Sequence, residues 1–252
     1  MTDLFVAEHG DEAGPLLVVV HGSLDRSSAF VKVIRQLPDV HAVRYDRRGY
    51  AHSIDLAPGT SISEQVDDLV SVVAGRPAVL FGHSIGGVIA LTFAHRHPEL
   101  TRAVLAFEAS MAWADWWPTD TAGAVLASGE RTPAAAAERF MRRMVGDARW
   151  ESLPERTKAQ RRAEGPALIA DLRSIRAPAP APYEPVELRV PVVSAHGSES
   201  RPHHIEAARR LAAEAPGAEL HVVDGAGHGV HLSHPAATAD LVRVALARAG
   251  EG

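Results

Sequence analysis

The sequence contains no cysteine at any of its 252 positions. This absence excludes a disulfide framework, a thiol nucleophile and a thiolate metal site. The sequence also lacks any apolar stretch of membrane-spanning length, and its N-terminus lacks the basic start and apolar run of a signal peptide. We therefore expect a cytoplasmic protein with no membrane partner.

An excess of positive charge is absent as well. The 26 basic and 31 acidic side chains give a formal net charge of −5, which argues against nucleic acid as a partner. The apolar fraction of 46% and the mean hydropathy of −0.05 are typical of a globular protein rather than a disordered or membrane protein. The composition gives no indication of the oligomeric state.

Short β-rich runs alternate with helical patterns along most of the chain. The predicted strands cover residues 4–10, 15–22, 41–49, 77–84, 102–109, 190–197 and 218–225. The predicted helices between them cover residues 27–37, 61–74, 85–97, 203–215 and 235–248. Alternation of helices with continuously apolar strands is typical of the α/β class. It predicts a doubly wound, mostly parallel sheet.

One long segment interrupts this alternation. Residues 111–186 contain no convincing strand but carry helical patterns at 132–145 and 152–175, the second broken at Gly165–Pro166, and end in a proline-rich connector. We expect a helical cap over residues 111–186, inserted into a core formed by residues 1–110 and 187–252.

The sequence Gly82-His-Ser84-Ile-Gly86 stands where a predicted strand ends and a helix begins. A serine in such a turn takes a strained backbone conformation, and flanking side chains would collide with the neighbouring strand and helix. We interpret Ser84 as a nucleophile. The alternative interpretation is a structural turn whose serine only caps the helix.

A serine nucleophile needs a base, and His228 lies on a glycine-rich loop after the last predicted strand. His228, His231 and His234 are spaced by threes, but no carboxylate stands within this series, so the pattern is weak evidence for a metal site. The sequence predicts neither a metal nor a cofactor.

The chain resembles the α/β-hydrolase superfamily over nearly its whole length, and in particular the small serine hydrolases with a helical cap. The similar motifs, in family order, are HGS (21–23), YDRRGYAHS (45–53), GHSIGG (82–87) and GAGHGVHLSHP (225–235). The resemblance implies an α/β-hydrolase fold and an oxyanion hole formed by the backbone amides of Ser23 and Ile85.

The acid of a Ser–His–acid triad departs from the usual family pattern. In most relatives an aspartate stands in a G-x-x-D loop, but here that position is Ser200. Glu108 ends the strand that follows the nucleophile's strand, where some relatives place the acid, and Glu199 is one residue from the usual position. We favour Glu108 as the acid. Glu199 remains an alternative, as does a role for Glu108 in anchoring the cap through an arginine.

A serine, a histidine and an oxyanion hole fit acyl transfer to water. We expect a carboxylic ester hydrolase that cleaves a small ester or lactone. Three alternatives stay open: a non-catalytic ligand receptor, a hydrolase of carbon–carbon bonds, and a cofactor-free oxygenase or perhydrolase at the same site. This scaffold hosts many chemistries, so the fold alone does not distinguish them.

Aromatic and methionine side chains in the cap are candidates for the substrate-binding wall. Trp113, Trp116 and Trp117 have the spacing of one helical face, and Met111 and Met144 could line the same cavity. This composition favours an apolar or aromatic substrate. Alternatively, these side chains only pack the cap onto the core.

Overall fold

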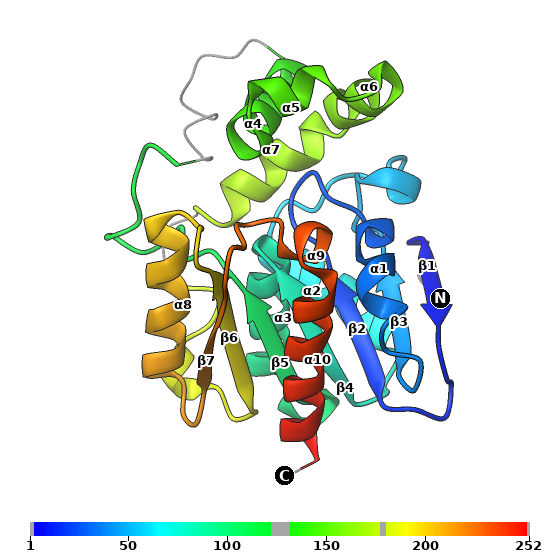
Figure 1. The fold of residues 1–252 in the computed structure, drawn as a ribbon, viewed down its shortest axis with the longest axis vertical. Helices are drawn as coiled ribbons and strands as arrows, with labels where there is room; N and C mark the ends of the chain where they lie inside the picture. Colours follow the sequence, from blue (N-terminus) through cyan, green and yellow to red (C-terminus); the bar gives the residue numbers. More distant parts are fainter. Residues whose placement is uncertain (1–2, 122–131, 177–179, 251–252) are drawn as a thin grey trace.

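The computed structural model describes residues 3–121, 132–176 and 180–250. Within these ranges a seven-stranded sheet forms the centre of the molecule, with strand order β1-β3-β2-β4-β5-β6-β7 (Figure 1). Every neighbouring pair is parallel except β1 and β3, which are antiparallel. The carboxyl ends of the six parallel strands therefore meet at one edge of the sheet.

The sheet strands and their flanking helices follow one another along the chain. The strands are β1 (Val6–His9), β2 (Leu16–Val20), β3 (His41–Tyr45), β4 (Ala78–His83), β5 (Thr101–Phe107), β6 (Val192–Gly197) and β7 (Glu219–Val223). The flanking helices are α1 (Val31–Ile34), α2 (Ile62–Val73), α3 (Ile85–Arg96), α8 (Pro202–Glu214), α9 (Val230–Ser233) and α10 (Pro235–Ala249). Short 3-10 helices are η1 (Ser27–Phe30), η2 (Ala51–Ser53), η3 (Pro98–Leu100) and η5 (Pro185–Glu187).

Alternate residues of the central strands enter two separate hydrophobic cores. In β5, Val104 and Ala106 join the core that contains α2, α3 and α8, whereas Leu105 and Phe107 join the core that contains α1 and α10. Both faces of the sheet are thus covered, which explains why the strand sequences are continuously apolar rather than alternating. The predicted doubly wound sheet is confirmed.

Four further helices lie beyond the carboxyl edge of the sheet (Figure 1). They are α4 (Pro133–Val145), α5 (Asp147–Glu151), α6 (Glu155–Ala163) and α7 (Gly165–Ser174). Thr132 caps α4 through a hydrogen bond from the amide of Ala135, and α7 begins at the predicted break. A helical insertion at this place agrees with the expectation, while the division into a core and a cap domain stays a prediction.

Local differences from the sequence prediction concern the ends and continuity of elements. The predicted helix 27–37 is shorter, since η1 and α1 together end at Ile34. The helical pattern at 152–175 forms two helices that follow a separate short helix, α5. None of the helices in the described ranges combines the length and apolarity needed to cross a bilayer.

Candidate active site

Ser84 sits at the tight turn between β4 and α3, with φ of 57° and ψ of −124°. The flanking glycines permit this turn: a Cβ on Gly82 would lie 2.4 Å from the carbonyl oxygen of Gly86, and one on Gly86 would lie 2.1 Å from that of Val20. Ser84 is the N-cap residue of α3, but its hydroxyl makes no capping hydrogen bond, which favours the nucleophile interpretation over the cap interpretation.

Glu108 and His228 meet at the same edge of the sheet. The Nδ1 atom of His228 lies 2.6 Å from Oε2 of Glu108, whose side chain is completely buried. Glu108 follows β5 and takes a positive φ of 50°, which is rare for a residue with a side chain. Strained backbone of this kind clusters at functional sites, and here it occurs both at Ser84 and at the carboxylate that faces the candidate base.

The other oxygen of Glu108 is also occupied. Its Oε1 accepts hydrogen bonds from the backbone amide of Gly197, at 3.1 Å, and from the hydroxyl of Ser200. Ser200, which stands at the position expected for the acid from the family resemblance, therefore donates to the predicted acid Glu108. Glu199 is exposed, and its backbone amide donates to the carbonyl of Ala226. This geometry favours Glu108 over Glu199 as the partner of His228.

Electrostatics keep Glu108 ionised. Burial would raise the pKa of the carboxyl, but the hydrogen bond and attraction of His228, with smaller contributions from His204 and Ser200, lower it to about 2. His204 stacks on His228 with ring centroids 4.5 Å apart, and burial holds the pKa of His204 well below its usual value. A neutral ring therefore covers one face of the candidate base, and an ionised carboxylate holds its Nδ1 atom.

A pocket opens at this edge of the sheet. Its lining includes Ser84 and His228 together with Ser23 and Ile85, the residues expected to supply the oxyanion-hole amides. The structure thus brings together the predicted nucleophile, base and oxyanion-hole residues, with Glu108 directly behind the base.

The predicted tryptophan wall is only partly present. Trp117 and Met144 line the pocket, whereas Trp113 packs edge-on against Tyr183 and the Trp116 ring faces the Arg210 guanidinium at 4.7 Å. Met111 is buried in the core.

The expectation that the three tryptophans share one face of a helix is wrong. The segment forms successive turns, with hydrogen bonds from Ala114 to Met111 and from Trp117 to Ala114. Pro118 disfavours helical backbone at Trp117, so the spacing of an α-helix does not apply here.

Asp171 on α7 is a residue that sequence reasoning missed. Its buried carboxylate forms a bidentate pair with Arg47 at 2.9 and 2.7 Å and accepts hydrogen bonds from Tyr50, Gln65 and the hydroxyl of Ser23. Although burial opposes ionisation, Arg47 and these donors keep the pKa of Asp171 below its usual value. One carboxylate from the helical insertion thus holds the loop that carries the expected oxyanion-hole residue Ser23.

A signal for Asp171 does exist in the sequence. It stands three residues after Leu168 and four before Ile175, so a charged residue lies on the apolar stripe of its helix. Such a residue is expected to have a buried partner. The identity of that partner, more than one hundred residues away, is visible only in the structure.

We expect Asp171→Ala to lower the free energy of unfolding by about 3–5 kcal/mol, because it leaves the Arg47 charge buried without its partner. Urea denaturation at pH 7 measures this change. Asp240→Ala is the matched control, since Asp240 pairs with Arg243 on the exposed surface and its loss should cost about 1 kcal/mol or less. Equal stability of the two variants would contradict a stabilising role for the Asp171 network.

Residues 17–241 match the model of the alpha/beta hydrolase family. The match covers most of the chain, and the protein belongs to this family. The resemblance drawn from the motifs is therefore confirmed, as is the fold class.

Curated relatives of the chain include several hydrolases. The chain is 32% identical over 109 residues to 2-(acetamidomethylene)succinate hydrolase of Mesorhizobium japonicum, an alignment that spans 42% of this chain and 38% of the relative. It is 28% identical over 260 residues to pimeloyl-[acyl-carrier protein] methyl ester esterase of Chromobacterium violaceum, which spans 92% and 93% of the two chains. The chain spans 38% of the uncharacterized hydrolase YraK of Bacillus subtilis.

Solved structures agree on the fold. The enol-lactonase from Burkholderia xenovorans LB400 superposes with a TM-score of 0.76 at 21% identity, over 97% of this chain and 96% of that one. Identity at this level supports the shared architecture and does not by itself transfer the lactonase activity.

Proposed function

We propose that the protein is a serine hydrolase that cleaves a carboxylic ester or a lactone through an acyl-enzyme on Ser84. The observation that carries the proposal is the 2.6 Å contact between His228 Nδ1 and the fully buried carboxylate of Glu108, next to a serine on a strained turn. The names of the esterase and lactonase among the similar proteins support the same reaction class.

The mechanism assigns one task to each group. Ser84 attacks the carbonyl carbon of the substrate while Nε2 of His228 takes the hydroxyl proton and passes it to the leaving oxygen. Glu108 holds the Nδ1 proton of His228 and stabilises the imidazolium, and the backbone amides of Ser23 and Ile85 donate to the oxyanion. A water molecule, deprotonated by the same histidine, then cleaves the acyl-enzyme.

The pocket lining supports an apolar substrate group. Ala112, Trp117, Phe140, Met144 and Leu172 all contribute to it. Such a surface binds an apolar or ring-bearing acyl or alcohol group, while the few polar side chains around it fix orientation.

A fluorophosphonate tests the proposal directly, because its phosphorus reacts with an activated serine and loses fluoride. We expect one adduct per chain in the intact mass, mapped to the peptide that contains Ser84, together with turnover of a short-chain nitrophenyl ester. A folded protein with neither adduct nor turnover would contradict the proposal and would favour a ligand receptor on the same fold.

A further inference from the structure

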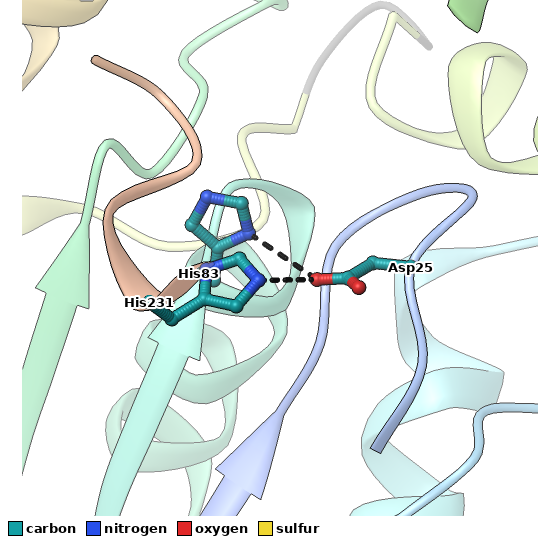
Figure 2. A group of neighbouring side chains, drawn as sticks. All are labelled: Asp25, His83 and His231. Carbon is teal, nitrogen blue, oxygen red and sulfur yellow. Dashed lines mark ion pairs between the residues drawn. The ribbon is translucent and has the colours of Figure 1, made fainter. Parts of the chain in front are cut away.

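A second group of ligating side chains lies beside the candidate triad. Asp25 follows β2, His83 is the last residue of β4, and His231 belongs to α9 (Figure 2). Their side chains converge: Asp25 Oδ2 lies 3.1 Å from His231 Nε2 and 3.9 Å from His83 Nδ1. All three ligand atoms lie within 4.8 Å of one another.

Each of these three atoms lacks a hydrogen-bond partner although it is buried. Asp25 Oδ2 and His231 Nε2 contact each other at 3.1 Å, and neither atom has a further hydrogen-bond partner. The side chains of His83 and His231 are only 6% and 2% exposed. Buried polar atoms without partners are costly, so three of them directed at one point indicate a missing ligand.

The tautomer of His83 suits metal coordination. Its Nε2 lies 2.7 Å from the backbone carbonyl of His228, which can only accept a hydrogen bond, so the proton resides on Nε2 and the lone pair on Nδ1. A neutral imidazole held by an outer hydrogen bond is the usual form of a histidine ligand.

We propose that Asp25, His83 and His231 bind a divalent transition-metal ion, with Zn²⁺ as the best match. Ligand atoms about 2.0–2.1 Å from a tetrahedral zinc ion lie about 3.3 Å apart. The two contacts of Asp25, at 3.1 and 3.9 Å, lie on either side of this value, and all three atoms lie within 4.8 Å of one another. Two imidazoles and one carboxylate are a common zinc ligand set, and the pocket that these residues line leaves access for a water as the fourth ligand.

The proposal departs from the sequence expectation of no metal, which considered His228, His231 and His234 as a series. In the structure these histidines face different groups: His228 is hydrogen-bonded to Glu108 and His234 to the hydroxyl of Ser233, whereas His231 lies 3.1 Å from Asp25. The carboxylate that the series lacks comes from Asp25, about two hundred residues away in the sequence.

A second group of side chains that could hold a metal ion consists of Glu108, His204 and His228. Its carboxylate already accepts hydrogen bonds from His228, Gly197 and Ser200. The Asp25 group, in contrast, has all three ligand atoms free of hydrogen bonds, which is why we assign the ion to it.

The proposed ion would connect the three segments that carry the candidate machinery. Asp25 stands two residues after Ser23, His83 directly precedes Ser84, and His231 stands three residues after His228. Binding is therefore expected to raise the temperature of unfolding, a readout that does not depend on the proposed hydrolase activity.

Calorimetric titration of the EDTA-dialysed full chain with ZnCl₂ tests the site, with visible absorption of Co²⁺ as a second readout of the ligand set. We expect one ion per chain, an increase in melting temperature with zinc, and affinity at least about tenfold weaker in Asp25→Asn and in His231→Gln. His234→Gln is the matched control from the same loop and should bind as the wild type does.

The variant His228→Gln tests which of the two groups binds the ion. If zinc binding is retained there and lost in Asp25→Asn, the ion lies at the proposed site. Loss in His228→Gln with retention in Asp25→Asn would place it in the catalytic group and overturn the proposal. Absence of binding to the wild type, or unchanged binding in both Asp25→Asn and His231→Gln, would also overturn it. Because either Asp25→Asn or His231→Gln could fail to fold, both variants are tested, and a melting curve in EDTA shows whether each one is folded.

Discussion

Replacement of Ser84 by alanine is expected to lower kcat for a nitrophenyl ester by about six orders of magnitude, the scale on which loss of a triad nucleophile acts. Alanine has no oxygen to form the acyl-enzyme, so only binding and the oxyanion-hole amides would remain. Initial rates at saturating substrate measure the change, and the fluorophosphonate adduct should disappear with the activity.

The loss should not come from misfolding. The Ser84 hydroxyl makes no capping hydrogen bond to α3, and alanine needs no more space than serine in the same turn. Melting curves should therefore nearly coincide. Ser71→Ala is the matched control, because Ser71 is an exposed serine on α2 and its replacement should leave kcat unchanged. Retention of most activity in Ser84→Ala would eliminate the acyl-enzyme mechanism.

Glu108→Gln is expected to lower kcat by about four orders of magnitude, as loss of the triad carboxylate does where it misdirects the histidine tautomer. The structure explains which way the new amide would turn. Oε1 of Glu108 accepts from the Gly197 amide and the Ser200 hydroxyl, so the glutamine oxygen is held there. Its NH₂ group would then face Nδ1 of His228 and donate a hydrogen bond to it. The ring proton would therefore reside on Nε2, the atom that must be unprotonated to accept the proton of Ser84.

Glu199→Gln provides the matched comparison, since it removes an exposed carboxylate one residue from the usual position of the acid. We expect its kcat to stay within about twofold of the wild type. Steady-state kinetics on both single variants and on the double variant distinguish the two carboxylates. If Glu199→Gln lost the activity and Glu108→Gln kept it, the assignment of Glu108 would be wrong.

Local sequence patterns were enough to predict most of the fold. The seven strands lie within a few residues of the predicted runs, because apolar strand sequences and helix caps act over short distances. The turn at Ser84 was predictable from its motif. The requirement for glycine at position 82 arises within the turn, whereas the requirement at position 86 comes from the neighbouring strand β2, where a Cβ would meet the carbonyl of Val20.

Features that depend on contacts between distant segments could not be predicted. Asp171 reaches Arg47 only because the helical insertion folds back over the sheet edge, and Asp25 meets His231 only because two loops converge there. The choice between Glu108 and Glu199 stayed open in the sequence, because it depends on the direction of side chains at two neighbouring strand ends. The structure favours one of them through the contact to His228.

The hydrogen bond from Ser200 to Glu108 also bears on how such a site could have evolved. The side chains at positions 108 and 200 meet at the ends of two adjacent strands, so the carboxylate of an aspartate at position 200 would lie next to that of Glu108. Two carboxylates held so close do not both ionise, and one would have to keep a proton at neutral pH. Transfer of the acid from one strand to the other therefore has to pass through a form with a protonated pair or a form with no acid. Under the proposed function, the form with no acid would lose the partner of His228, whereas the protonated pair would keep one carboxylate beside it.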